Sequence, residues 1–183
     1  APVTLLRTLP PAPQPPVSRG GRLAAILESG RLRVGFDDDS VPWAFVNARG
    51  EVVGFDAEMA HSLALQLGVR LEFVLLPRDR ERVVEALDSG VIDAIMSGAR
   101  ASTRSAARVA YSQPYAEETV AFLVEDHRRE EFASADRLRG RRLRIGAAPV
   151  PEWLEAVGRA LPEAEIVPLM SIREYVEKKG SLD

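Results

Sequence analysis

An alternation of short apolar runs with longer amphipathic runs between residues 31 and 98 constrains the fold more than any other feature. RLRVGF, RLEFVLL and DAIMSG are typical of strands, and FDAEMAHSLALQLG and DRERVVEALDSG are typical of helices. Strands that alternate with helices imply a mostly parallel sheet with helices on both faces. Ligands of such sheets collect at the carboxyl ends of the strands. The pattern therefore predicts an α/β fold with a binding site at one edge of the sheet.

The spacing of apolar residues predicts which face of each helix is buried. Four of them recur at intervals of four in the helix that follows Gly54: Phe55, Met59, Leu63 and Leu67. Asp56 is expected to be the N-cap of this helix. A shorter helix is expected in SRGGRLAAILESG, which ends at Gly30 and has three apolar residues on one face: Leu23, Ile26 and Leu27.

The strand and helix pattern begins again in the second half of the chain. RRLRIG and AEIVPL are predicted strands, PEWLEAVGRAL and IREYVEKKG are predicted helices, and DHRREEFASADRLRG is expected to be a surface segment with a short helix. Between the two halves, ETVAFLVED is expected to be a long strand that crosses from one lobe to the other. We therefore expect lobe 1 over residues 18–117, and the crossing strand and lobe 2 over residues 118–183.

Residues 1–17 are expected to be a proline-rich linker. Residues 8–20 hold five of the 13 prolines of the chain. Proline fixes φ and removes a hydrogen-bond donor, so that such a segment favours an extended, polyproline-like conformation. We expect residues 1–17 to pack poorly against the two lobes.

Composition excludes several classes of function. The chain has 183 residues, a net charge of −3, no cysteine and two histidines, His61 and His127, which lie far apart in the sequence. Thiolate chemistry is absent, no metal-ligand spacing is present, and no basic segment indicates nucleic acid as a partner. No apolar run approaches the roughly 18 residues of a membrane span, so direct membrane insertion is not expected. No cofactor is expected either.

Four stretches in fixed order carry a family resemblance: residues 37–45, 50–56, 93–98 and 112–115. They resemble the first lobe of the family 3 extracellular solute-binding proteins, the amino-acid receptors of bacterial uptake systems. The resemblance covers roughly residues 25 to 183 and implies the two-lobed α/β fold of the type II periplasmic binding proteins. Because the family's second lobe is followed by a strand that returns to the first, and the sequence stops at residues 181–183, we expect a C-terminally truncated domain with both lobes incomplete.

The resemblance implies ligand-binding roles for residues at the ends of the first and third predicted strands of lobe 1. Asp37 and Asp39 fall at positions where members of the family contact the ligand's amino group or line the cleft, and Trp43 takes the place of the cleft aromatic. Ser97 and Gly98 end the strand that begins at Asp93, where backbone amides reach a ligand. Alternatives stay open, because Trp43 would also suit a partly buried lobe position and the Ser97–Gly98 pair would suit a simple tight turn. The run of three aspartates from Asp37 lacks the alternate spacing of a calcium site.

Three arginines distinguish this sequence from the family pattern. The family places a carboxylate-binding arginine at the position of Ser105, and here Arg104 lies one residue before it; Arg100 replaces a serine or threonine, and Arg80 replaces a stacking aromatic. The guanidinium fork suits carboxylates. We therefore expect a small anionic solute, such as an acidic amino acid or a dicarboxylate. The alternative is that all three are solvated surface residues, since 22 of the 24 basic residues are arginines.

The function implied by the resemblance is solute binding for a membrane transport system, in the periplasm or at the outer face of the cytoplasmic membrane. The segment DHRREEF resembles most the solute-binding domain fused C-terminally to sodium:dicarboxylate symporter-like membrane proteins. A transporter domain or subunit is then the expected partner, and no enzyme activity is expected. Two alternatives remain: a dehydratase-like enzyme, whose only candidate acids are Asp79 and Glu81, and a ligand-sensing domain of a signalling receptor.

Overall fold

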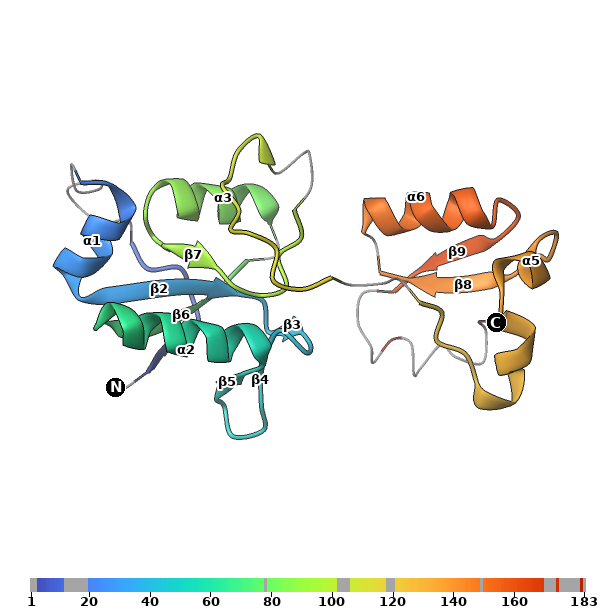
Figure 1. Ribbon diagram of the computed structural model, residues 1–183, viewed down its shortest axis with the longest axis horizontal. Coiled ribbons are helices and arrows are strands. Elements are labelled where there is room, and N and C mark those ends of the chain that lie inside the picture. The colour runs from blue at the N-terminus through green and yellow to red at the C-terminus, as the bar shows by residue number, and fades with distance from the viewer. Residues whose placement is uncertain are drawn as a thin grey trace. The chain divides into compact units, whose positions relative to one another are not determined.

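The computed structural model describes residues 3–11, 20–77, 79–101, 106–117, 121–148 and 150–169, together with Glu174 and Leu182. The chain divides into two compact units, Ala1–Gln113 and Pro114–Asp183 (Figure 1). The division lies close to the predicted boundary after residue 117. That the two units are the two lobes of the predicted domain stays a prediction.

Unit 1 is built on a four-stranded parallel sheet in which β6 and β2 are the two inner strands. In the order of pairing, the strands are β1 (Thr4–Leu6), β6 (Arg70–Leu75), β2 (Arg31–Phe36) and β7 (Ala94–Ile95). Phe36 lies opposite Leu75 of β6, and Gly35 lies opposite Ile95 of β7. Because all the pairs are parallel and nearly in step, the four strands end at the same edge of the sheet.

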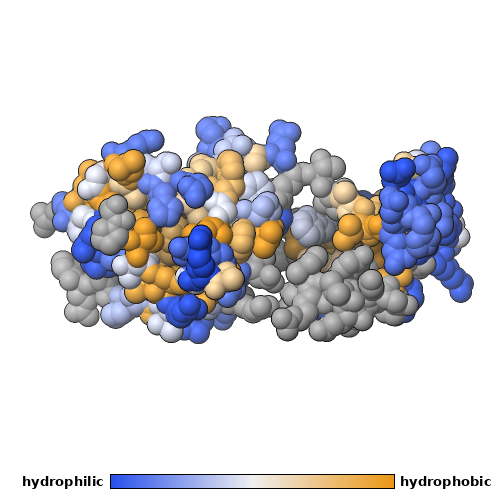
Figure 2. Space-filling view, turned by 90° about the horizontal axis from the view of Figure 1, so that it is seen from below, coloured by the Kyte–Doolittle hydropathy of each residue, from blue (hydrophilic) through white to orange (hydrophobic). Residues whose placement is uncertain are grey.

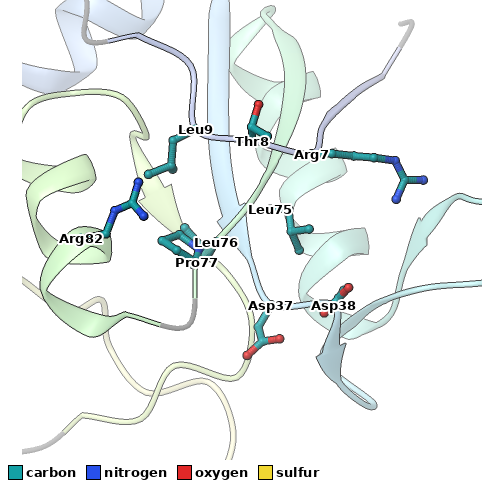
Figure 3. Close-up of a pocket in the computed structure, with 9 residues that line it drawn as sticks. All are labelled: Arg7, Thr8, Leu9, Asp37, Asp38, Leu75, Leu76, Pro77 and Arg82. Carbon is teal, nitrogen blue, oxygen red and sulfur yellow. The ribbon is translucent and has the colours of Figure 1, made fainter.

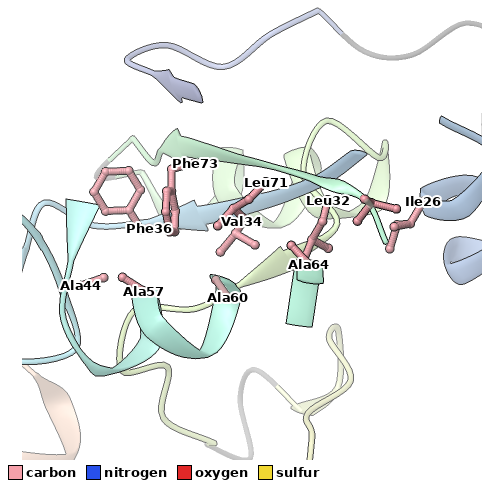
Figure 4. Packing of buried hydrophobic residues seen from close by; sticks show 11 residues of the cluster. Ile26, Leu32, Val34, Phe36, Ala44, Ala57, Ala60, Ala64, Leu71 and Phe73 are labelled. Atoms are coloured by element: carbon pink, nitrogen blue, oxygen red, sulfur yellow. The ribbon is translucent and has the colours of Figure 1, made fainter. Parts of the chain in front are cut away.

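Helices cover both faces of this sheet, as the alternation predicted (Figure 1). Helices α1 (Gly21–Ser29) and α2 (Phe55–Leu67) pack on one face, and α3 (Arg80–Asp88) packs on the other. Neighbouring residues of β6 serve the two faces, since Phe73 belongs to the core under α2 and Val74 to the core under α3. The rings of Phe36 and Phe73 meet edge to face at 5.7 Å between centroids in the first of these cores (Figure 4).

The predicted buried faces of α1 and α2 are wrong in part. The sheet-facing side of α2 is a row of alanines: Ala57, Ala60 and Ala64. Phe55 is 51% exposed and Leu63 is 37% exposed, and apolar groups lie among polar ones on this side of unit 1 (Figure 2). Small side chains let the helix backbone approach the sheet, which leaves the larger apolar residues at the flanks. In α1, Ile26 is buried, whereas Leu23 is 56% and Leu27 is 50% exposed.

A small antiparallel sheet follows β2. It consists of β3 (Asp39–Ser40), β4 (Ala44–Val46) and β5 (Val52–Val53). The connection from β3 to β4 contains a cis peptide between Val41 and Pro42. The connection from β4 to β5 is a turn in which Asn47 Oδ1 accepts hydrogen bonds from the amides of Arg49 and Glu51. The side-chain amide of Asn47 also donates to Glu51, which lowers the pKa of that carboxyl. The sheet thereby leads the chain from the end of β2 to the start of α2.

Unit 2 has a parallel pair of strands and a core of its own. Strands β8 (Arg144–Ala147) and β9 (Glu165–Pro168) confirm the two predicted strands, and α6 (Pro151–Ala160) confirms the predicted helix between them. The surface segment before them forms a 3-10 helix, η1 (Asp126–Phe132), and a short helix, α5 (Ala135–Leu138). Three leucines make up the centre of this core: Leu138, Leu143 and Leu161. The helix predicted in IREYVEKKG lies outside the described residues, apart from Glu174.

The predicted crossing strand is not present over residues 121–125, the part of it that the structure describes before η1. In this stretch Phe122 is 41% exposed and Leu123 is 67% exposed. A strand needs a neighbour for its backbone hydrogen bonds, and the described sheet of unit 2 contains only β8 and β9. Apolar residues alone therefore did not make this segment a strand. Residues 118–120 lie outside the described residues.

The linker predicted over residues 1–17 is wrong for Thr4–Leu6. These residues form β1, which extends the edge of the main sheet in parallel with β6, with Leu5 opposite Phe73. Leu5 packs against the core under α2, and Leu6 and Leu9 pack against the core under α3. Three strand-compatible residues before the prolines suffice for this pairing, which the proline content of the following residues concealed. Residues 12–19 lie outside the described part of the chain.

Replacing Leu5 with alanine tests whether β1 contributes to stability. Because Leu5 is half-buried, we expect the free energy of unfolding to fall by about 1–2 kcal/mol, less than for a fully buried leucine. Thr4→Ala on the same strand, where Thr4 is exposed, serves as the control and should cost less. Urea unfolding measures both variants. Equal losses in the two variants would show that β1 adds no packing energy.

Asp93 ties β7 to β2. Its Oδ2 accepts a hydrogen bond of 2.8 Å from the amide of Arg33, and its own amide donates to the carbonyl of Arg33 at 2.8 Å. Burial raises the pKa of the Asp93 carboxyl, although the Arg33 amide and the charges of Arg33 and Arg22 act in the opposite direction. The protonated form is therefore favoured in the folded protein more than in the unfolded chain.

Asp93→Asn should alter how the stability of the protein depends on pH. A raised folded-state pKa contributes stability that is complete below the unfolded value of 3.8 and is lost as the pH rises through the folded value. The asparagine keeps an acceptor for the Arg33 amide and cannot titrate. We expect the difference in unfolding free energy, wild type minus variant, to decrease as the pH rises above 3.8. Urea unfolding across this range measures it, and a difference that does not change with pH would contradict the assignment.

Candidate ligand-binding site

Two strand ends are joined at the carboxyl edge of unit 1. Asp37 directly follows β2, and Ser97 lies two residues after β7. The amide of Asp37 donates to Ser97 Oγ at 2.9 Å, and the Ser97 hydroxyl is 3.4 Å from the carbonyl oxygen of Asp37, to which it donates. The structure thus brings together two of the residues that the sequence predicted for the site. The edge of the sheet is where ligands of parallel α/β sheets bind.

The turn after β7 is held by a buried carboxylate. Gly98 donates its amide to Asp56 Oδ2 at 2.7 Å, and Asp56 is fully buried in the first turn of α2. The N-cap of α2 is Gly54, so the prediction that Asp56 caps this helix is wrong. A carboxylate is favoured there by the positive end of the helix dipole, and here it also fixes the turn. The position of Asp56 at the start of the helix suited an N-cap equally well, so its role in fixing the turn at Gly98 was not predicted.

Trp43 packs directly over the same turn. Gly98 has φ of +66°, and a Cβ at this residue would lie 2.4 Å from Trp43 Cδ1. The Trp43 ring meets Phe55 edge to face at 5.7 Å, and the Trp43 carbonyl accepts from the Asp56 amide at 2.8 Å. Trp43 is half-buried. The predicted cleft aromatic therefore lies beside Gly98 and is partly exposed.

The predicted arginines are less well placed than the strand ends. Arg100 is exposed, two residues beyond Gly98, and its carbonyl accepts a hydrogen bond of 3.2 Å from the Tyr111 hydroxyl. Arg104 and the side chains of Arg80 and Asp39 lie outside what the structure describes. Their roles in ligand binding stay predictions.

The acids considered for catalysis have structural partners. Asp79 is the N-cap of α3 and accepts from the Glu81 amide at 2.9 Å. Glu81 pairs with Arg108 at 2.5 Å, and this hydrogen bond raises the pKa of Arg108. Over the described ranges, acidic and histidine side chains form no group of three that could hold a metal ion. In the same part of the chain, every helix is too short or too polar to cross a bilayer.

A hollow of about 550 Å³ lies at the ends of β2 and β6 and includes Asp37 in its lining (Figure 3). Its lining contains apolar and charged residues from four segments: Arg7, Thr8, Leu9, Asp37, Asp38, Leu75, Leu76, Pro77 and Arg82. Sequence reasoning missed this hollow, because its outer wall comes from residues that were assigned to the linker.

Comparison with known proteins identifies the family. Residues 32–175 match the family model of the bacterial extracellular solute-binding proteins, family 3. The chain belongs to this family. The L-cystine-binding protein TcyJ of Escherichia coli (strain K12) is 30% identical over 135 residues, which are 73% of this chain and 50% of TcyJ. The chain thus spans about half the length of this relative.

Solved structures confirm the fold class. The ancestral amino acid-binding protein AncCDT-1, described as a precursor of cyclohexadienyl dehydratase, is 29% identical with a TM-score of 0.75, covering 88% of this chain and 71% of that one. An amino acid ABC transporter substrate-binding protein from Streptococcus pneumoniae, bound to L-arginine, is 30% identical with a TM-score of 0.69, covering 88% and 68%. These neighbours have the type II periplasmic binding fold. This family 3 chain has the same architecture as these neighbours, a mixed α/β fold with a parallel sheet.

Gly98→Ala tests the packing between the turn and Trp43. We expect a loss of about 2–4 kcal/mol in unfolding free energy. The alanine would have to adopt the left-handed backbone conformation of Gly98, and its Cβ would overlap the Trp43 ring. Gly50→Ala is a matched control, since Gly50 has φ of +79° with no heavy atom within 4 Å of an added Cβ, and it should cost only the backbone term, about 1–2 kcal/mol. Urea unfolding compares the two. Equal losses would show that Trp43 does not pack on Gly98.

Proposed function

We propose that the chain binds a small amino acid at the carboxyl edge of unit 1 and does not convert it. The observation that carries this proposal is the convergence of Asp37, Trp43, Ser97 and Gly98 on two joined strand ends. The Asp37 carboxylate would receive an ammonium group, Arg100 would receive a carboxylate, and the half-buried Trp43 ring would support the ligand's side chain.

The relatives support an amino acid as the class of ligand. TcyJ is named for L-cystine, and the Streptococcus protein is bound to L-arginine. Both ligands carry an ammonium and a carboxylate. These are the two groups that one aspartate and one arginine at the edge of the sheet can pair with.

The narrower expectation of an anionic solute rests on Arg80, Arg100 and Arg104. Within it, we propose an acidic amino acid over a dicarboxylate. The carboxylates of Asp37 and Asp38 beside the site would repel a ligand that has no ammonium group. Neither L-cystine nor L-arginine is anionic overall at neutral pH, so the two relatives favour the amino acid without favouring the additional negative charge.

Calorimetric titration of the 183-residue chain with glutamate, arginine and leucine tests the proposal. We expect Asp37→Asn to weaken every amino acid that binds, by about ten- to a hundredfold, because each loses the charge partner of its ammonium group. Arg100→Ala should weaken glutamate most. Glu58→Gln, an exposed carboxylate on α2, is the control and should change nothing. Unchanged affinity in Asp37→Asn would contradict the proposed site, and equal affinity for glutamate and leucine would contradict the anionic preference.

We further propose that the chain acts outside the cytoplasm and delivers its solute to a membrane transporter. Membership of an extracellular family and the transporter named for the Streptococcus protein support this role. Fusion to a sodium:dicarboxylate symporter-like protein rests only on the resemblance of the segment that forms η1. Sequencing the gene upstream of the codon for Ala1 tests this fusion, because a fused protein would have membrane-spanning segments encoded there.

A dehydratase is the alternative function, favoured by the similarity to a precursor of cyclohexadienyl dehydratase. Two contacts support binding without turnover: Asp79 caps α3, and Glu81 forms an ion pair with Arg108. An assay for dehydration of cyclohexadienyl carboxylates separates the two functions. Turnover that is lost in Glu81→Gln would favour the enzyme.

A further inference from the structure

We propose that one end of unit 2 binds peripherally to a bilayer that contains anionic phospholipid. This end consists of η1, α5 and the arginine-rich segment that leads into β8; we call it the basic end, and it comprises residues 126–144. Two apolar residues, Phe122 and Leu123, come shortly before it in the chain. None of these residues belongs to the candidate ligand site, so the inference goes beyond the proposed function.

The basic end concentrates positive charge in a chain that is acidic as a whole. Seven arginines stand against four acidic residues, a formal surplus of three positive charges, whereas the whole chain has a net charge of −3. None of these arginines is buried, and this end of unit 2 is strongly hydrophilic (Figure 2). The arginines are Arg128, Arg129, Arg137, Arg139, Arg141, Arg142 and Arg144. Such an uneven distribution of charge lets one end of an acidic protein attract an anionic surface.

Ion pairs within the basic end leave the surplus charge in place. A single carboxylate, Glu131, serves two guanidiniums, that of Arg141 at 2.9 Å and that of Arg128 at 3.5 Å. The hydrogen bond from Arg141 is the main cause of the lowered pKa of this carboxyl. Arg129 and Arg142 are exposed, and among the described residues neither forms an ion pair. The surplus is therefore carried by the two arginines that share Glu131 and by these two exposed arginines.

Exposed apolar side chains lie beside the arginines. Phe122 is 41% exposed and Leu123 is 67% exposed. The Phe122 ring lies 6.5 Å from the Phe132 ring between centroids, and the guanidiniums of Arg128 and Arg141 lie 5.2 Å and 5.9 Å from the centroid of the same Phe132 ring. A surface of this composition suits the bilayer interface, where apolar groups enter the head-group layer and cationic groups remain at the phosphates.

This composition favours an anionic bilayer over an acidic protein as the partner. The arginines are distributed over two helical segments and the start of a strand, and each guanidinium fork can pair with a lipid phosphate. An acidic protein would match the charge, but the exposed Phe122 and Leu123 favour a partner with an apolar layer directly under its charged groups. Each arginine near an anionic bilayer strengthens binding about fivefold, so that a surplus of three predicts about a hundredfold preference for anionic over neutral lipid.

Co-sedimentation of the 183-residue chain with lipid vesicles tests the inference. We expect binding to vesicles of equal parts phosphatidylcholine and phosphatidylglycerol, about a hundredfold weaker binding to phosphatidylcholine alone, and a decrease of the anionic binding with added salt. Arg129→Gln and Arg142→Gln should each weaken binding to the anionic vesicles about fivefold. Arg129→Lys keeps the charge and should bind nearly as well as the wild type.

Two variants separate the basic end from net charge alone. Leu123→Ser leaves the charge unchanged and should weaken binding to the anionic vesicles about tenfold, because it removes an apolar group from the interface. Arg49→Gln is the matched control: it removes one positive charge from an exposed arginine of unit 1 and should change nothing. Equal binding to both kinds of vesicle, binding to neither, or equal losses in Arg49→Gln and Arg129→Gln would overturn the inference.

Discussion

The parallel pairing of β2 with both of its neighbours is the constraint on which the rest of unit 1 depends. β2 lies between β6 and β7, and because of its register with them all three strands end at the same edge of the sheet. The backbone hydrogen bonds of the sheet thereby place Asp37, Leu76 and Ser97 close together, although they are far apart in the sequence.

A second layer of interactions fixes the turn that follows β7. The buried Asp56 carboxylate holds the Gly98 amide, and the Trp43 ring occupies the space that any side chain at residue 98 would need. The site is therefore shaped from α2 and from the small antiparallel sheet as well as from the strand ends. A carboxylate buried in this way is expensive unless it is hydrogen-bonded, so the Gly98 amide and the helix N-terminus are required partners.

The α/β fold class could be predicted from the sequence because it depends on local patterns, whereas Asp37, Ser97 and Gly98 were assigned to the site through the family resemblance. Apolar runs with helices between them define a parallel sheet, and the residues after each strand define its ligand edge. Sequence reasoning missed the alanine face of α2 because spacing alone favoured the larger residues, and depth of burial depends on how closely the helix approaches the sheet. It also missed β1, since the prolines after Leu9 indicated an extended linker and the pairing partner of β1 is β6, more than sixty residues away in the chain. The predicted strand over residues 121–125 failed for the opposite reason, because apolar residues without a neighbouring strand do not form a sheet.

The central claim is that the carboxyl edge of unit 1 is where this family 3 chain binds its ligand. Amide chemical-shift mapping by NMR, with the isotope-labelled 183-residue chain titrated with an amino acid, tests it most directly. We expect the largest shifts at Asp37, Ser97 and Gly98. Shifts confined to unit 2, or to α1 at the opposite end of β2, would contradict it.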